Sequence, residues 1–327
     1  HLKRDGATFK GEAEEFVTGK PLNVTDIEVA SDGSLFFTTG GRNTEGGVYR
    51  IRTLKKPVDS VDPLAPPKEV IAVGKALEQP QVQSAWGRDA IGHFKDVAGE
   101  VWARELQSIA QDQGYQTSRR IRAVGCLVSV GPEPSLDLTR RLTADPDPEL
   151  RALAATLLLR HPAAEVTSDL IGLLDDKAPL VQRRALEGLI RTQTPAPIDK
   201  LKPLLASKDR FVRYTARLAL QRIDPAKWYE AVALDKNPRV VISGLVAVNR
   251  IGLVATNATV AENVLAKIQS LLQTKMLPED ELDVLRTLEL TLVNTSFGTV
   301  ARSASEGDAD DKDSRPSLAR RATVDAI

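Results

Sequence analysis

Three stretches of the sequence are versions of one motif, and this motif decides the fold: DPELRALAATLLLR (147–160), APLVQRRALEGLIR (178–191) and DRFVRYTARLALQR (209–222). Each version begins with a polar or small residue and has an aliphatic residue three positions later. Five such aliphatic anchors follow one another at intervals of 29, 31, 31 and 28 residues: Ile121, Leu150, Val181, Val212 and Val240. A period of this length is typical of helical repeat proteins.

Small residues stand four positions after each anchor, and mostly aliphatic residues stand eight positions after it. The small residues are Gly125, Ala154, Ala185, Ala216 and Gly244, and the second set is Ser129, Leu158, Leu189, Leu220 and Val248. Offsets of four and eight lie on one face of a helix. We therefore expect neighbouring helices to approach closely at the small residues, with the aliphatic residues packed beside them.

Helix starts are predicted three residues before the anchors, at Ser118, Asp147, Ala178, Asp209 and Asn237. All but Ala178 carry side chains that accept hydrogen bonds from the free amides of a first helical turn. Leucine-rich stripes at 138–142, 170–174 and 201–205 supply a second helix to the repeats. Because one helix pair cannot bury its own apolar face, the pairs must stack.

The three stretches quoted above resemble HEAT-like repeats. Arg122, Arg151 and Arg213 directly follow their anchors, where such repeats often carry arginine, whereas Gln182 and Val241 depart from that pattern. The sequence thus predicts a mainly α protein, a HEAT-like α-solenoid over residues 85–300. Further helices are expected over 260–272 and 281–293, the latter with Leu282, Leu285, Leu288 and Leu292 on one face.

The segments on either side of the solenoid differ from it in composition. Residues 1–53 contain short apolar runs separated by Asp-Gly and Gly-Gly pairs, which predicts a small antiparallel β-meander. Four strands in this length match one terminal blade of a β-propeller. We expect an extended linker over the proline-rich residues 54–84. Residues 301–327 are predicted to be an acidic disordered loop, centred on 303–317, and the start of a truncated helix.

The overall composition excludes several classes of protein. The 44 basic and 44 acidic side chains cancel, so no net field favours nucleic acid or an anionic membrane. No apolar run reaches the roughly 18 residues of a membrane span. The first residues lack the apolar segment of a signal peptide, and no initiator Met is present, so we expect the chain to be a piece of a larger protein.

Side chains that bind metals are few. Cys126 is the only cysteine, which excludes an intramolecular disulfide and a Cys-x-x-Cys motif, and we expect it to be a buried apolar residue. None of His1, His93 and His161 has a partner at zinc-ligand spacing. The aspartate run at 308–313 lacks the Gly and Glu of an EF-hand loop, which favours a solvated loop over a calcium site. No metal site is predicted.

Arginines are dense in the middle of the chain: Arg183, Arg184, Arg191, Arg210, Arg213, Arg217 and Arg222. A nucleic-acid surface would gather them on one face with aromatic residues between them. Carboxylates interleave with them instead, which favours charged outer faces and ion pairs between repeats. We therefore expect protein partners or neighbouring domains rather than nucleic acid.

LKRDGATFKGEAEEFVTGKPLNVTDIEVASDGSLFFTTGGRNTEGGVYRI (2–51) resembles the last propeller blade of large secreted bacterial dehydrogenase-like proteins. Their propellers are similar to soluble glucose and sorbosone dehydrogenases that use pyrroloquinoline quinone. In such proteins HEAT-like helices follow the propeller, and a c-type cytochrome with a Cys-x-x-Cys-His motif commonly follows the helices. The resemblance covers roughly residues 1–300, and this chain lacks the earlier blades and the cytochrome motif.

The resemblance implies a periplasmic or secreted parent protein with pyrroloquinoline quinone, calcium and haem c outside this chain. It also implies cofactor-binding roles for Asp26 and Arg42, which would lie at strand ends, where propellers place ligand groups. Arg42 could bind a quinone carboxylate through two parallel hydrogen bonds. The other interpretation is that Asp26 caps a turn and that Arg42 is an exposed loop residue.

Three hypotheses of function follow. The first is a non-catalytic HEAT-repeat scaffold, without catalytic residues or a cofactor of its own, that binds a protein partner or holds neighbouring domains. The second is a segment of a pyrroloquinoline-quinone-dependent sugar or alcohol dehydrogenase. The third is an independent HEAT adaptor protein.

Overall fold

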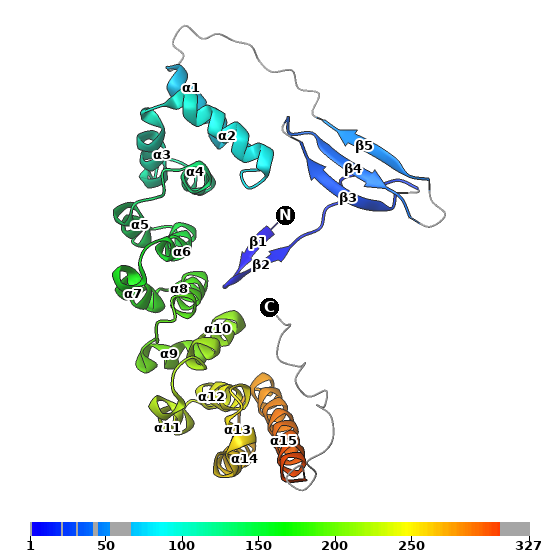
Figure 1. Cartoon of the computed structure of the whole chain (residues 1–327), viewed down its shortest axis with the longest axis vertical. Coiled ribbons are helices and arrows are strands. Elements are labelled where there is room, and N and C mark those ends of the chain that lie inside the picture. The colour runs from blue at the N-terminus through cyan, green and yellow to red at the C-terminus, as the bar shows by residue number, and fades with distance from the viewer. Residues whose placement is uncertain (1, 21, 31, 42–44, 53–66, 308–327) are drawn as a thin grey trace. The chain divides into compact units, whose positions relative to one another are not determined.

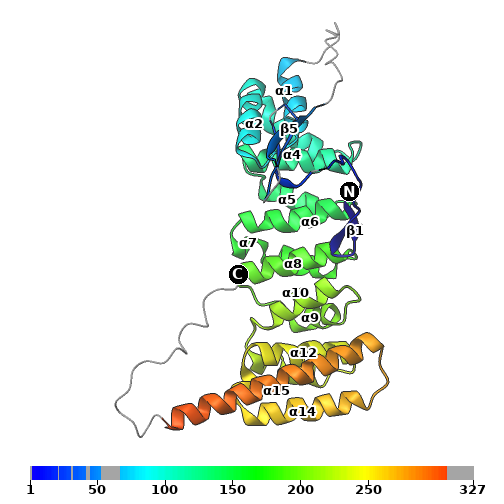
Figure 2. The same ribbon diagram turned by 90° about the vertical axis from the view of Figure 1, so that its right-hand side faces the viewer.

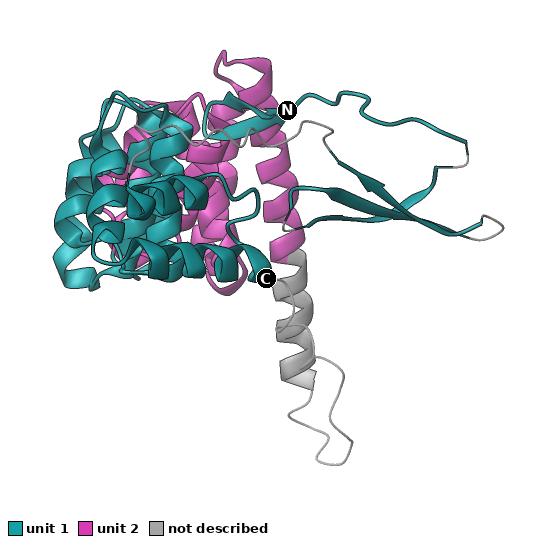
Figure 3. Cartoon of the chain, turned by 90° about the horizontal axis from the view of Figure 1, so that it is seen from above, with its two compact units in different colours: residues 1–194 teal, residues 195–327 magenta. Residues whose placement is uncertain are grey.

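The computed structural model describes residues 2–20, 22–30, 32–41, 45–52 and 67–307, with side chains described as far as residue 295 (Figure 1). The chain divides into two compact units, His1–Thr194 and Pro195–Ile327 (Figure 3). Within each unit, short helices pack in antiparallel pairs, and successive pairs stack (Figure 2). This arrangement confirms the predicted fold class, a HEAT-like α-solenoid with small antiparallel sheets at the N-terminus.

The N-terminal strands form two separate sheets rather than the single four-stranded meander that the sequence predicts. Strands β1 (Leu2–Asp5) and β2 (Thr8–Gly11) pair as a hairpin. Strands β3 (Val24–Val29), β4 (Leu35–Thr39) and β5 (Gly47–Ile51) form an antiparallel sheet in that order. The described residues between β2 and β3 form no strand, because this exposed acidic stretch offers no alternating apolar face to pair.

Helices of the first unit begin earlier than predicted. Their bounds are α1 Lys68–Leu77, α2 Ala85–Ala98, α3 Val101–Gln111, α4 Thr117–Val130, α5 Leu136–Thr143, α6 Pro148–Leu157, α7 Ala163–Gly172 and α8 Pro179–Arg191, with 3₁₀ turns at Leu158–Arg160 and Leu173–Asp175. The prediction of an extended linker over 54–84 was wrong where α1 lies. The prolines of this segment all precede Lys68 or follow Leu77, so none interrupts the helix, and Pro67 stands at its N-cap.

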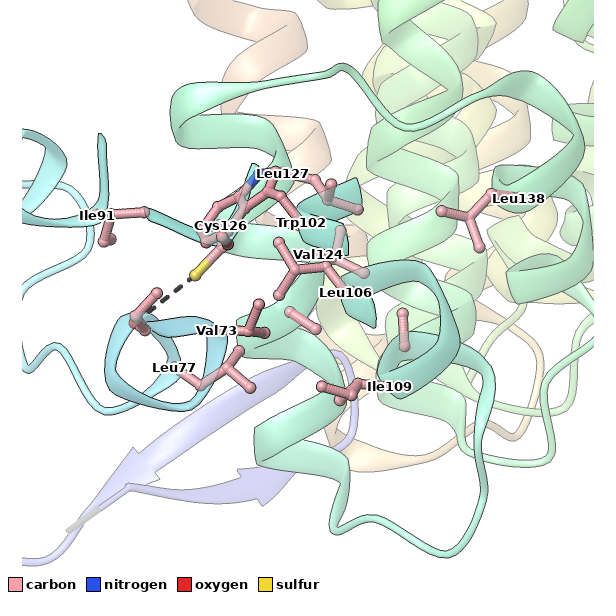
Figure 4. Close-up of a cluster of buried hydrophobic side chains, with 14 of the residues drawn as sticks. Val73, Leu77, Ile91, Trp102, Leu106, Ile109, Val124, Cys126, Leu127 and Leu138 are labelled. Carbon is pink, nitrogen blue, oxygen red and sulfur yellow. Dashed lines mark hydrogen bonds between the residues drawn. The ribbon is translucent and has the colours of Figure 1, made fainter. Parts of the chain in front are cut away.

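The core of the first unit explains why α1 forms. Its apolar face, Ala72, Val73, Ala76 and Leu77, packs into a cluster with α2, α3 and α4 (Figure 4). Trp102 is buried there, and its indole N–H donates to the Gly131 carbonyl at 2.9 Å. Cys126 lies in the same cluster, fully buried as predicted, with its sulfur 3.8 Å from the Ala76 carbonyl oxygen.

The second unit holds the remaining helices. Their bounds are α9 Ile198–Leu205, α10 Arg210–Leu220, α11 Tyr229–Ala233, α12 Pro238–Arg250, α13 Leu253–Thr256, α14 Ala258–Leu272 and α15 Pro278–Gly307, with a 3₁₀ turn at Pro225–Lys227. Helix α15 continues seven residues beyond the predicted end of the solenoid at 300, and so into the first part of the segment predicted to be disordered. Residues 308–327 lie outside the described part of the chain.

The predicted repeat register holds from the second repeat onward. The anchors Leu150, Val181, Val212 and Val240 are buried, and the small residues Ala154, Ala185 and Ala216 have no exposed surface. The first repeat is shifted by two residues, because Ala123 and Leu127 are fully buried in place of the predicted Gly125 and Ser129, and the predicted anchor Ile121 is only half-buried.

Three of the four predicted N-caps are confirmed. The side chains of Asp147, Asp209 and Asn237 accept hydrogen bonds from first-turn amides of α6, α10 and α12. The prediction for Ser118 was wrong, since α4 begins at Thr117 and its N-cap is Gln116, two residues before Ser118.

Candidate functional site: an arginine groove in the second unit

Helices α10, α12 and α15 border a groove of about 560 Å³. We call it the arginine groove and define it by its lining: Arg210, Arg213, Tyr214, Arg217, Ile242, Ser243, Val246, Arg250, Asp283, Arg286, Thr287, Glu289, Leu290 and Val293. Five arginines thus face two carboxylates, while Ile242, Val246 and Leu290 supply buried or half-buried apolar surface.

The first wall, α10, begins where the Asp209 carboxylate accepts hydrogen bonds from the amides of Phe211 and Val212, at 2.8 and 3.2 Å. Its buried positions include Val212, Ala216 and Leu220. Since Arg210, Tyr214 and Arg217 occur at spacings of four and three, they lie together on another face. The apolar period that builds the repeat therefore also directs these polar side chains into the groove.

The second wall, α12, is pressed closely against α11. A Cβ atom built on Gly244 would lie 2.2 Å from Cγ1 of Val232, so a hydrogen is the only side chain that fits here. This is the close approach that the repeat pattern predicts for its small position. It fixes α12, which places Ile242, Ser243 and Val246 in the groove and Arg250 at its end.

The third wall, α15, is fastened to α12 at two levels. Near its start, Nε of Arg239 donates to Asp280 at 2.6 Å, and Arg239 also pairs with Glu279. Further along, the buried Asn249 amide donates to the Thr291 hydroxyl at 3.0 Å. These contacts turn Val284, Thr287 and Thr291 inward. Leu282, Leu285 and Leu292, three of the leucines expected on one face of this helix, are about half exposed.

The groove arginines differ in how their charges are satisfied. Arg213 donates to the carbonyls of Ser207 and Lys208, at 2.7 and 3.0 Å, and so closes the turn before α10. Arg286 lies 3.7 Å from Asp283. Arg210 lies over the ring of Phe211, and Arg217 over the ring of Tyr214, with 4.7 and 5.0 Å to the ring centroids.

The guanidinium groups of Arg210, Arg217 and Arg250 have no hydrogen bond or ion pair within the part of the chain that the structure describes, and those of Arg217 and Arg250 lie close enough for their charges to act on each other. Burial lowers the pKa of the half-buried Arg217 guanidinium below its usual value, and the like charge of Arg250 adds to this effect. Two positive charges from different helices therefore face one groove without a compensating carboxylate, an arrangement that favours an anionic ligand.

Of the two residues predicted to bind a cofactor, Asp26 lies in the described part of the chain. Asp26 lies in β3, is exposed, and accepts a hydrogen bond from the next amide, that of Ile27, at 2.8 Å. Arg42 lies outside the described residues, so the two cofactor-binding residues remain a prediction. No three His, Cys, Asp or Glu side chains gather as a metal site would require in the described ranges. None of the helices described is long and apolar enough to cross a bilayer.

Ion pairs between repeats were predicted for the dense arginines, but Arg183 and Arg184 both pair with Glu187 within α8 itself, at 2.8 and 2.7 Å. Sequence reasoning missed the groove, because Arg250 and Arg286 join Arg217 from helices 33 and 69 residues further along the chain. The spacing of Arg210, Tyr214 and Arg217 is the one local signal that could have identified its first wall.

The geometry defines the class of protein first: an α-solenoid built of HEAT-like helix pairs. In agreement, the family model for HEAT repeats matches residues 135–221. No curated protein matches the chain. A solved structure, the complex of CpcE and CpcF of phycocyanin lyase from Nostoc sp. PCC7120, is similar at 17% identity with a TM-score of 0.34, and the match covers 74% of this chain and 100% of that one.

Proposed function

We propose that the chain is a non-catalytic HEAT-repeat scaffold whose arginine groove binds a segment of a protein partner. The observation that carries this proposal is the groove itself, in which exposed Tyr214 and Val293 border a partly apolar floor next to uncompensated arginines. Exposed apolar and aromatic side chains next to arginine are typical of protein-binding surfaces. Stacked helical repeats commonly present such extended surfaces to partners.

A selection of random 12-residue peptides displayed on phage, with the full chain as bait, tests the proposal. We expect enriched peptides whose affinity, measured by fluorescence anisotropy, falls roughly tenfold or more for the double variant Tyr214→Ser, Val293→Ser. Both side chains are about half exposed, so the fold should tolerate the change. Tyr115→Ser, an exposed tyrosine of the first unit, is the matched control. The absence of enriched peptides, or equal binding to the double variant, would overturn the proposal.

The parent protein is a separate proposal, which rests on the sequence resemblance of residues 2–51 and not on the groove. On this proposal the parent is a periplasmic or secreted redox protein whose pyrroloquinoline quinone, calcium and haem c lie outside this chain. Its test is dye reduction by the purified chain with added quinone, calcium and a panel of sugars and alcohols. We expect no turnover above the cofactor blank. Turnover that Asp26→Ala or Arg42→Ala abolishes would instead favour the dehydrogenase segment.

A further inference from the structure

We infer that the arginine groove selects an acidic partner segment, with one carboxylate bound by Arg217, a second by Arg250, and an apolar side chain placed over Ile242 and Val246. This inference rests on the proposed function and adds the chemistry of the partner. Its basis is the set of charges that the groove leaves uncompensated.

Two of the five groove arginines already have polar partners. Arg213 donates to two backbone carbonyls of its own turn, and Arg286 lies 3.7 Å from Asp283. Arg210, Arg217 and Arg250 have no polar partner for their guanidinium groups among the described residues, and Arg217 and Arg250 are the two whose like charges act on each other. They come from α10 and α12, so a ligand that binds both spans the groove.

A half-buried guanidinium without an anion is electrostatically costly, and the neighbouring charge of Arg250 increases the cost. A bound carboxylate offsets both the burial of the Arg217 charge and its repulsion by Arg250, because guanidinium and carboxylate can form two parallel hydrogen bonds. The stacking of Arg217 on Tyr214 keeps its planar group oriented, which reduces the entropy lost on binding.

The remainder of the lining favours a peptide over a nucleic acid. Asp283 and Glu289 on the α15 wall would repel any anion beside them, which a continuous phosphate backbone cannot avoid but two separate carboxylates bound at Arg217 and Arg250 can. Tyr214 is the one aromatic residue of the lining, and Arg217 lies over one face of its ring, so the groove lacks the succession of aromatic rings on which consecutive bases stack. The apolar atoms of Ile242, Val246 and Leu290 instead suit an aliphatic side chain between two carboxylates.

The experiment uses the full chain and two synthetic fluorescein-labelled peptides, GSEELEEGS and its uncharged counterpart GSQQLQQGS, with binding measured by anisotropy at several salt concentrations. We expect the acidic peptide to bind at least about tenfold more tightly and to weaken as salt increases. Arg217→Gln and Arg250→Gln should each remove most of that preference. Arg222→Gln, an exposed arginine of the same unit outside the groove, should leave it intact. Thermal melts confirm that the variants fold.

Each contrary result has a distinct meaning. Equal binding of the two peptides, or an unchanged preference in both arginine variants, overturns the inference. If groove-dependent peptides from the phage selection are uncharged, the inference fails while the proposed function survives. Tighter binding of a labelled 12-residue oligo-dT than of the acidic peptide overturns it in favour of nucleic acid. A large gain in peptide affinity on replacing the aspartates of 308–313 by asparagine overturns it in favour of the chain's own acidic segment.

Discussion

Arg151 in α6 donates from Nε and Nη2 to the two carboxylate oxygens of Asp176, at 2.6 and 2.9 Å, across the turn that leads into α8. Asp176 also accepts the amide of Ala178, the N-cap residue of α8, at 2.8 Å. The Asp176 side chain thus links α6 of one repeat to the start of α8 in the next repeat. Asp145 does the same one repeat earlier, where it pairs with the buried Arg120 and accepts the amide of Asp147 at 2.9 Å.

Asp176→Asn should lower the free energy of unfolding by about 1.5–3 kcal/mol at pH 7, because it removes a charge-assisted pair. Burial alone would raise the pKa of Asp176, but the hydrogen bonds from Arg151 and the Ala178 amide outweigh burial and lower it. Since the pKa in the folded state lies below the unfolded value of about 3.9, the stabilisation is complete above that value and is lost as the pH falls through the folded pKa.

Denaturant unfolding of wild type and Asp176→Asn at several pH values checks this. The difference between the two should shrink in acid, and a difference equally large at pH 7 and pH 3 would contradict the account. Asp137→Asn is the control, because Asp137 and Arg141 form an exposed pair within one helix, so its effect should stay below about 0.5 kcal/mol.

Ala185→Leu should destabilise the chain by about 1–3 kcal/mol, because Ala185 has no exposed surface and a larger side chain must displace its neighbours. Ala164→Leu is the matched control, since Ala164 lies on an exposed face of α7 in the same unit. Thermal unfolding measures both. A loss of only a few tenths of a kcal/mol at Ala185 would show that the repeat register is wrong there.

Two glycines that the sequence pattern places at equivalent repeat positions should respond in opposite directions to alanine. Gly244→Ala places a methyl group against Val232 and should destabilise by about 1–3 kcal/mol. A methyl group on Gly125 would meet no other side chain or distant backbone atom within 4 Å, so Gly125→Ala should stabilise α4 by about 0.5–1 kcal/mol. Equal effects in chemical denaturation would refute the two-residue shift of the first repeat.

The Cys126 thiol should react slowly in the folded chain. Burial raises its pKa to about 11, so little thiolate forms at pH 8, and the surrounding core excludes reagents. Labelling with a thiol-reactive dye should become fast only when denaturant unfolds the first unit. Rapid labelling of the native chain at pH 8 would show that the core around Cys126 opens readily.

The repeat pattern predicted the stacked helix pairs because burial of aliphatic and small residues at fixed offsets is a local property of the sequence. It placed Ala154, Ala185 and Ala216 correctly. It failed in the first repeat, where the buried Arg120 is stabilised by Asp145 and the Ala110 carbonyl, partners that apolar periodicity does not reveal. The pattern also missed α1. The segment 54–84 is rich in proline as a whole, but residues 68–77 contain no proline and can form a helix.

The candidate site was less predictable than the fold. The cofactor-binding roles of Asp26 and Arg42 follow only from the resemblance to a propeller blade. The described strands form two separate sheets rather than the single sheet of such a blade. The groove depends on Arg217, Arg250 and Arg286, which belong to three helices. Only the packing of α12 and α15, through Asn249 and Thr291, brings these helices together, and that polar contact leaves no periodic signal in the sequence.

The central claim, that Arg217 and Arg250 are the anion-binding groups of a protein-binding groove, is tested most directly by charge reversal on both sides. The measurement is isothermal titration of the double variant Arg217→Glu, Arg250→Glu with the acidic peptide GSEELEEGS and with its basic counterpart GSKKLKKGS. The account predicts that wild type binds the acidic peptide and not the basic one. The double variant should bind the basic peptide and no longer the acidic one. A double variant that still binds the acidic peptide as wild type does, and ignores the basic one, would contradict it.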